Sequence, residues 1–287
     1  MNIMTMNYPD KVYVTILSTN TYLPGVLTLH HSLMQTNTKY KFYCLITPNL
    51  SKEVKEILYI FDIETITITP LSNPHNTDIN DRRFYNYSKL NMFGLTQFKK
   101  IVYLDADMIV MHNIDELFEK KNMSGTNAGG WLDSNKGWVQ LNSGLIVVEP
   151  NANVFADMKS KIGLIEKDKG KGDQAFLHSY YSNWPDQDDL HLDHVYNVFH
   201  THLDGYKKKH GYYLDKKIKI DNTDFDKSRI KIVHYIGQEK PWNNISKILN
   251  HKNKNSGTLK MKAEILWLKY YTNALEHKNM DNKNILQ

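Results

Sequence analysis

The first third of the chain alternates short β-branched runs with segments of helical periodicity, and this alternation constrains the fold more than any other feature. Strands are expected at Val12–Leu17, Lys41–Ile46, Glu64–Ile68 and Lys100–Leu104, each a short run rich in Val, Ile, Tyr or Thr. Between successive strands, apolar residues recur at helical spacing. This order predicts parallel strands with helices on both faces, and such a sheet binds ligands beyond the carboxyl ends of its strands.

Capping residues mark where the helices of this pattern begin. Pro24 and Gly25 open the first helix, Ser51 is placed to cap the second, and Ser88 is expected to cap the third. The less regular second half predicts two strands, Leu145–Val148 and Ile230–Tyr235, and three helices, Ala152–Ile165, Asp173–Tyr180 and Leu259–Leu275. We expect one α/β domain over residues 1–275 and a frayed tail over 276–287.

Composition argues against several classes of protein. No stretch approaches the ~20 apolar residues of a membrane helix, so no membrane span is expected. The single cysteine, Cys44, lies in an apolar run and should be buried, and a chain without internal disulfides fits a cytoplasmic location. The net charge of +5 is spread over lysines, so no nucleic-acid partner is expected. The densest basic run, Lys207–His210, is interpreted as a lip for an anionic ligand.

Two carboxylates, Asp105 and Asp107, follow the apolar strand that ends at Leu104. Residues two apart in an extended chain project to the same side, so both acids can reach one cation. Oxygen ligands suit Mn²⁺ or Mg²⁺, ions that are commonly shared with a diphosphate. The alternative interpretation is a solvated loop, because Asp-x-Asp is frequent by chance.

A second segment, Ile232 to Trp242, carries three residues suited to a metal–diphosphate site. His234 lies at a strand end, where its imidazole can bind a metal. Gly237 lets the backbone approach a ligand closely, and Lys240 offers a charge for a phosphate. A histidine by itself would more often be structural.

Two further segments suit a sugar pocket. Asn142 can hydrogen-bond sugar hydroxyls, and Gly144 leaves room for a ring just before the strand at Leu145. Asp173 and Gln174 stand at an expected helix start. An ordinary turn for the first segment, and a simple N-cap role for Asp173, are the alternatives that remain open.

Taken in order, these segments resemble glycosyltransferase family 8, with its glycogenin and galactinol synthase branches most similar. The resemblance runs from Val12 to Trp242 and rests on Val14–Thr19 with Tyr22 and Gly25, Tyr87–Leu90, the acid pair with Asn113–Phe118, Asn142–Gly144, Gly172–Gln174 and His234–Trp242. It implies a single-domain glycosyltransferase A-type fold, Rossmann-like, with a mostly parallel sheet flanked by helices. It also implies a UDP-sugar donor, Mn²⁺ with Mg²⁺ as the alternative, and retention at the anomeric carbon.

The resemblance assigns roles residue by residue. Asp105, Asp107 and His234 match the metal ligands, and Asp173 and Gln174 match groups that stabilise the cationic centre in catalysis. The matching donor contacts are Ile16, Ser18, Thr19 and Tyr22 of the first nucleotide loop, with Tyr22 stacked on uracil, then Lys89, Asp105, Ala106, Asp107, Asn142, Gly237 and Lys240. The implied reaction moves a hexose, glucose first and galactose next, from a UDP-sugar to a hydroxyl acceptor.

The acceptor stays open, as a small molecule, a glycan, a protein or the chain itself. Two positions depart from the glycogenin pattern: Gly170 replaces an aspartate, and Asp204 stands where glycogenin carries the tyrosine that it glucosylates. Other hydroxyls for self-transfer, within a chain or between the chains of a homodimer, lie in a lysine-rich stretch expected to form a mobile surface: Tyr196, Thr201, Tyr206, Tyr212 and Tyr213.

Three functions outside glucosyl self-transfer remain as alternatives. Transfer to a small acceptor would match the galactinol synthase branch. A metal-dependent phosphohydrolase or nuclease would use similar ligands but usually needs more carboxylates. A non-catalytic sugar-nucleotide binder on the same fold is opposed by the intact set of Asp105, Asp107, His234 and Lys240.

Overall fold

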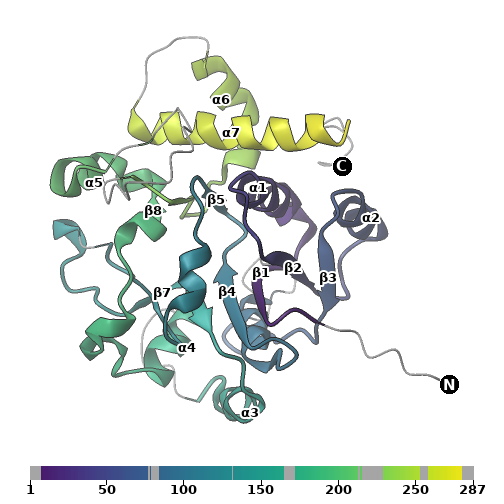
Figure 1. Cartoon of the computed structure of the whole chain (residues 1–287), viewed down its shortest axis with the longest axis vertical. Helices are drawn as coiled ribbons and strands as arrows, with labels where there is room; N and C mark the ends of the chain where they lie inside the picture. Colours follow the sequence, from purple (N-terminus) through teal and green to yellow (C-terminus); the bar gives the residue numbers. More distant parts are fainter. Residues whose placement is uncertain are drawn as a thin grey trace.

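The computed structural model describes residues 8–279 except 77, 79–83, 131, 165–171, 213, 215–228 and 253–257. Its centre is a six-stranded sheet of order β3-β2-β1-β4-β7-β6 (Figure 1). The strands are β1 (Lys11–Leu17), β2 (Lys41–Ile46), β3 (Glu64–Thr67), β4 (Lys100–Leu104), β6 (Gly125–Asn127) and β7 (Leu141–Val148). The first four run parallel and β7 is antiparallel to both of its neighbours, which confirms the predicted mostly parallel sheet.

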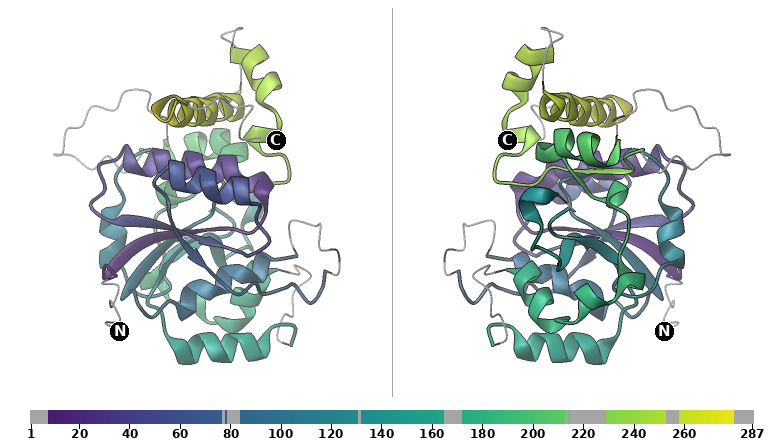
Figure 2. Two further views of the ribbon diagram at one scale, coloured as in Figure 1. Left: turned by 90° about the vertical axis from the view of Figure 1, so that its right-hand side faces the viewer. Right: turned by 90° about the vertical axis from the view of Figure 1, so that its left-hand side faces the viewer.

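Helices cover both faces of this sheet, as the sequence predicts. Figure 2 shows the sheet edge-on, with α1 (Leu23–Met34) and α2 (Lys52–Ile60) on one face and α3 (Ala152–Lys161) on the other. The long helix α7 (Leu259–His277) packs on the outer side of α1. On the face with α3 also lie α4 (Asp173–Tyr180) and η2, a 3₁₀ helix over Asn86–Gly94.

The alternation of side chains along the strands divides the core between these two faces. In β1, Tyr13 and Leu17 belong to the apolar cluster under α1 and α2, whereas Val12 and Val14 belong to the cluster with η2, α3 and α4. Both faces of the central strands are therefore buried. This explains why β1, β2 and β4 are nearly continuous apolar runs.

A second, three-stranded sheet has the order β5-β9-β8. Its strands are short: β5 (Met108–Val110), β8 (Val198–Phe199) and β9 (Ile232–His234). The chain leaves the large sheet at Leu104 and enters the small one at Met108. Residues 105–107, which include the acid pair, therefore form the link between the two sheets.

Two helix starts in the first third differ in outcome. The Ser51 hydroxyl accepts a hydrogen bond from the Val54 N–H, which confirms the predicted cap of α2. The predicted cap at Ser88 is wrong, because η2 begins at Asn86 and Ser88 lies inside it. Its hydroxyl instead accepts from the Leu71 N–H and donates to the Leu71 carbonyl, so Ser88 ties η2 to the preceding loop.

Two boundaries and one capping alternative in the second half are corrected by the structure. The strand predicted from Leu145 begins at Leu141, so Asn142 and its neighbours lie in β7 and not in a turn. Helix α3 ends at Lys161, where Gly163 adopts φ +80°, a conformation favoured by glycine. Gly172, not Asp173, is the N-cap of α4, so the N-cap alternative for Asp173 is wrong.

The described part of the lysine-rich stretch expected to be a mobile surface is partly helical, and residues 213 and 215–228 lie outside it. It contains α5 (Leu203–His210), which the sequence analysis did not predict, and α6 (Ile245–Lys252) follows later. Helix α7 continues to His277, two residues past the predicted end, and most of the predicted tail, 280–287, lies outside the described residues. Among the helices that the structure describes, none combines the length and apolar character needed to cross a membrane.

Candidate active site

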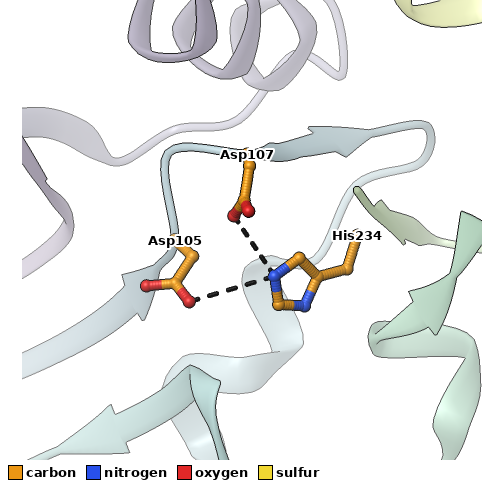
Figure 3. A group of neighbouring side chains, drawn as sticks. All are labelled: Asp105, Asp107 and His234. Carbon is orange, nitrogen blue, oxygen red and sulfur yellow. Dashed lines mark ion pairs between the residues drawn. The ribbon is translucent and has the colours of Figure 1, made fainter. Parts of the chain in front are cut away.

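The acid pair and His234 meet at the junction of the two sheets. Antiparallel pairing of β5 with β9 places Met108 opposite His234. Asp107 directly precedes Met108, so this register brings the imidazole beside Asp107. The Nε2 atom of His234 lies 3.2 Å from Oδ1 of Asp107 and 3.9 Å from Oδ2 of Asp105. Figure 3 shows the three side chains pointing toward one another from the end of β4, the link and β9.

These three residues form a ligand set that suits a divalent cation. One ligand atom from each lies within 4.8 Å of the others, which is the only such group of three among the described residues. Two carboxylates and one imidazole combine hard oxygen donors with a nitrogen donor, a set that suits Mn²⁺ and tolerates Mg²⁺. The chemistry of the side chains therefore fits the predicted metal.

Glycine at position 144 makes this convergence possible. A Cβ atom there would lie 2.6 Å from Cε1 of His234 and 2.9 Å from Oδ1 of Asn142. The Gly144 carbonyl also accepts a hydrogen bond from the Asp105 N–H at 2.8 Å. The sequence analysis reserved Gly144 for a sugar ring, whereas the structure shows that it leaves space for the histidine.

One of the two carboxylate oxygens of Asp105, Oδ1, is held by buried donors. Its Oδ1 accepts from the Tyr103 hydroxyl at 2.9 Å and lies 2.8 Å from the Lys89 ammonium. Burial and the neighbouring Asp105 charge raise the pKa of Tyr103 well above its ordinary value, so the phenol stays a donor. These contacts leave Oδ2 facing His234.

Asp107 is buried and paired with Lys240. The Lys240 ammonium donates to Oδ2 of Asp107 and to the Tyr235 carbonyl, and only 4% of Lys240 is exposed. Burial opposes the charge on Asp107, but His234 and Lys240 outweigh it and lower the pKa of this carboxyl far below its ordinary value. Asp107 is therefore a carboxylate throughout the physiological range.

A second polar network joins the candidate metal ligands to the predicted catalytic pair. The Lys89 ammonium lies 2.8 Å from Oδ2 of Asp173 as well as from Asp105. Burial opposes its charge, yet the two carboxylates raise the pKa of Lys89 above its ordinary value. Ser143 donates from its hydroxyl to Asp173 and from its backbone N–H to Gln174, at 2.9 and 3.1 Å. Asp173 and Gln174 are thus held in place by β7.

A cleft opens over these networks at the carboxyl ends of β1 and β4. It is lined by nine residues that the sequence analysis proposed, namely Ile16, Ser18, Thr19, Tyr22, Lys89, Asp105, Ala106, Asp107 and Asp173. Tyr85, Asn86 and Tyr103 also line it and were not predicted as site residues. The cleft therefore lies where a parallel sheet places its ligands.

The remaining proposed residues lie behind or beside this cleft. Lys240 packs near Tyr22, whose ring meets Trp242 edge to face at a centroid distance of 5.2 Å. Gly237 is exposed and adopts φ +96°, which favours glycine. Asn142 is buried in β7, and its Oδ1 already accepts from the Gly144 N–H. Any contact of Asn142 to a sugar would therefore come from its amide nitrogen.

The tyrosines considered for self-transfer are mostly inaccessible. Tyr206 is fully buried, and Tyr196 and Tyr212 are each 6% exposed. The Tyr196 hydroxyl donates to Glu116 and that of Tyr212 to Asp193, so both have structural roles. The expectation of a mobile surface is wrong for these three residues because their rings fill the core beside the small sheet. Tyr213 and Gly170 lie outside the described residues.

The same region also contains exposed residues that the sequence analysis singled out. Thr201 and Asp204 are exposed, on η8 (His200–His202) and the first turn of α5. The basic run of Lys207–His210 forms the last turn of α5, where Lys209 pairs with Asp133 at 2.7 Å. None of these residues lines the cleft.

A buried residue behind the cleft also went unnoticed in the sequence. Asn197, just before β8, is fully buried and its Oδ1 lies 2.9 Å from Nδ1 of His234. A polar residue flanked by Val195, Tyr196, Val198 and Phe199 was the available indication. A buried amide in an apolar run requires a partner, but the sequence does not say which.

Comparisons with known proteins agree with this geometry. The profile of glycosyl transferase family 8 matches residues 13–246. Glycogenin-1 of Caenorhabditis elegans is 31% identical over 242 residues, 81% of this chain and 51% of that protein. An inositol phosphorylceramide glucuronosyltransferase of Arabidopsis thaliana is 32% identical over 241 residues, 80% of this chain and 42% of that protein. The chain thus spans about half the length of these relatives.

The solved structure of an active-site mutant of LgtC superposes on the chain with a TM-score of 0.60 at 14% identity, covering 93% of this chain and 96% of that one. Together with the cleft and the sheet order, this likeness defines a glycosyltransferase A-type fold, as predicted. The family profile covers most of the chain, and this coverage assigns the family. The chain belongs to glycosyltransferase family 8.

Proposed function

We propose that this protein is a metal-dependent, retaining hexosyltransferase that uses a UDP-sugar donor. The observation that carries the proposal is the convergence of Asp105, Asp107 and His234 at the edge of a cleft lined by the predicted nucleotide loop. We propose Mn²⁺ as the ion, with Mg²⁺ as the alternative. A bound divalent ion would supply charge stabilisation to the departing diphosphate.

The chain's own residues then have distinct tasks. Tyr22 offers a ring for the uracil, with Trp242 behind it. Lys240 and Lys89 place ammonium groups beside the ligand carboxylates, where they can neutralise charge that develops on diphosphate oxygens. Gly237 lets the backbone approach the diphosphate.

Asp173 and Gln174 lie on the sugar side of this arrangement. Lys89 bridges Asp105 and Asp173, so the spacing between the metal ligands and the predicted catalytic carboxylate is fixed by one side chain. Asp173 and Gln174 would stabilise positive charge at the anomeric carbon while the glycosyl–phosphate bond breaks. Fixing them before the reaction avoids reorganisation during it.

The donor sugar that we propose is glucose, with galactose second. Glycogenins among the relatives support a hexose donor, whereas the glucuronosyltransferase relative requires that UDP-glucuronate be tested as well. For the acceptor, we propose a hydroxyl on a separate molecule. The burial of Tyr196, Tyr206 and Tyr212 and the aspartate at position 204 support this choice.

The test is incubation of the protein with Mn²⁺ and UDP-glucose, UDP-galactose or UDP-glucuronate, each with candidate small acceptors. Intact-mass measurement of the protein and of the small products then separates the outcomes. A glycosylated acceptor with an unchanged protein mass supports the proposal. A ladder of added hexose on the protein would replace it with self-transfer, within a chain or across a homodimer. Donor hydrolysis that never yields transfer, or tight UDP binding without turnover, would favour the hydrolase and binder alternatives.

A further inference from the structure

The side chain of Asn197 makes three hydrogen bonds, and none of them is to a residue that lines the cleft. Its Oδ1 faces Nδ1 of His234 at 2.9 Å, and its Nδ2 donates to Oγ1 of Thr126 at 3.0 Å and to Oδ1 of Asn142 at 2.9 Å. Asn197 has no exposed surface, and Thr126 has none either. A fully buried amide joined to a metal-ligand candidate has a role beyond packing.

The orientation of this amide follows from a backbone donor. The Gly144 N–H can only donate, and it donates to the Asn142 side chain at 2.9 Å, so Asn142 must present its oxygen. Because that oxygen also faces Asn197, Asn197 must present its nitrogen to Asn142. The Asn197 oxygen is then the atom that faces His234. The usual ambiguity between amide oxygen and nitrogen is removed by this chain of contacts.

An amide oxygen can only accept, so Nδ1 of His234 must carry the proton of that hydrogen bond. When the ring binds a cation, the other nitrogen, Nε2, gives up its proton and offers its lone pair to that cation. Nε2 is the atom that lies 3.2 Å from Asp107 and 3.9 Å from Asp105. The nitrogen able to bind a cation therefore faces both carboxylates.

We propose that Asn197 is a positioning residue that fixes the Nδ1–H tautomer of His234, with Asn142 and the Gly144 N–H holding Asn197 in the required orientation. The metal part of this inference rests on the proposed function; the tautomer part does not. It also gives Asn142 a role in the metal centre beside its predicted sugar contact. The partner that orients a ligating histidine commonly controls its metal affinity.

The competing explanation is that Asn197 only satisfies buried polar groups. It predicts a loss of stability on substitution and nothing specific at His234. The tautomer of a neutral histidine in water favours Nε2–H, so the proposed Nδ1–H form is a distinguishing outcome. It can be observed without any variant that might fail to fold.

The first measurement is ¹⁵N nuclear magnetic resonance of the histidine side chains in the metal-free wild-type protein. His234→Gln identifies the signals of His234 by their disappearance. The proposal requires a protonated Nδ1, with or without a second proton on Nε2 beside the Asp107 carboxylate. A ring protonated at Nε2 alone would overturn it. Asn197→Leu removes the acceptor and should abolish the preference for a protonated Nδ1, and persistence of that preference in the variant would also count against the proposal.

The second measurement is Mn²⁺ affinity, followed by electron paramagnetic resonance in the absence of nucleotide. Asn197→Leu removes the acceptor at similar volume and should weaken Mn²⁺ binding by about 10–100-fold. Asn113→Leu is the matched control, because Asn113 also makes two structural hydrogen bonds but lies beyond the far end of β5. Equal Mn²⁺ affinity in Asn197→Leu and Asn113→Leu would overturn the positioning role. A correct tautomer in a protein that binds no Mn²⁺ would instead contradict the proposed function alone.

Discussion

The two sheets contribute to the protein in different ways. The large sheet has strands of up to eight residues, and its central strands are buried on both faces. The small sheet has strands of only two and three residues, yet it positions His234, and the segment after β9 supplies Lys240. Asp105 and Lys89 belong to the side of the large sheet, and Asp107 links the two.

The large sheet mainly provides the stability of the fold, and the small sheet mainly provides the precise placement of site residues. Burial of apolar side chains on two faces of the large sheet provides most of the driving force for folding. The short strands of the small sheet provide register, since the pairing of Met108 with His234 decides where the imidazole lies. We therefore expect substitutions near β9 and β7 to affect metal and nucleotide binding more than they affect folding of the large sheet.

The largest effect is expected for Asp107→Ala, which removes a candidate metal ligand at the junction. A divalent ion supplies several kcal/mol of charge stabilisation, so transfer should fall by at least about 1,000-fold. Lys240 keeps its bond to the Tyr235 carbonyl, and the large sheet should stay folded. Activity assays, calorimetry with UDP and Mn²⁺, and circular dichroism test these points. Unchanged Mn²⁺-dependent UDP affinity in a folded variant contradicts the assignment, and an unfolded variant would show that stability and site geometry are not separable here.

Lys240→Ala tests the small-sheet side without touching a metal ligand. Truncating a charged hydrogen bond from Lys240 to a diphosphate oxygen should cost about 2–5 kcal/mol of binding free energy, so UDP should bind at least about 30-fold more weakly while uridine binding changes little. Because a positive charge beside Asp107 also opposes a cation, Mn²⁺ alone should bind at least as tightly as to the wild type. Calorimetry with UDP, uridine and Mn²⁺ separates the three, and exposed Lys208→Ala is the control. Equal losses for UDP and uridine would show that Lys240 does not contact phosphate.

Gly144→Ala tests a contact between the two sheets, since Gly144 lies in β7 of the large sheet but faces His234. The added Cβ would meet Cε1 of His234 at 2.6 Å, so the ring must shift. Overpacking costs about 1–3 kcal/mol, and we expect roughly tenfold weaker Mn²⁺ binding. Gly137→Ala is the matched control, because nothing lies within 4 Å of its added Cβ. Wild-type Mn²⁺ affinity in Gly144→Ala would mean that the position of His234 tolerates a shift.

The sequence predicted the large sheet well because the patterns that specify its strands and helices are local in the sequence. Alternating periodicity predicted the parallel strands and the helices on both faces, and the end of β4 placed Asp105 and Asp107 beside a ligand site. The errors there are boundaries, such as Ser88, whose hydroxyl bonds to Leu71 and not to its own helix. A capping pattern cannot distinguish these partners.

The small sheet was predictable only in part, because it depends on pairing between distant segments. His234 was proposed from a short strand and from family resemblance, but the register that places it beside Asp107 joins residues more than a hundred positions apart. Asn197 is a polar residue in an apolar run, and its partners Thr126, Asn142 and His234 come from three different strands. Helix α5 was missed because its lysines conceal the buried Leu203 and Tyr206.

The smallest effect that distinguishes the regions is a dependence of stability on pH. Burial lowers the pKa of His194, beside the small sheet, to about 4, and burial with the charge of His31 lowers that of His30, on α1, to about 4. In the unfolded chain both titrate near 6.5, so between about pH 6.5 and 4 the unfolded state binds more protons and stability falls as the pH falls. Each histidine should account for about 1 kcal/mol of the loss between pH 7.5 and 5.5.

Urea unfolding at these two pH values, in the wild type, His194→Gln and His30→Gln, measures the share of each residue. The quantity compared is the difference in free energy of unfolding between the two pH values, so a constant loss from the substitution itself cancels. His202→Gln, which removes a partly exposed histidine near the small sheet, is the control. If His194→Gln reduces the acid loss and His30→Gln does not, protonation acts through the small sheet, and Mn²⁺ affinity should fall over the same pH range. Equal reductions would show that acid weakens both regions together as one cooperative unit, and an acid loss unchanged in both variants would contradict the burial of these rings as its cause.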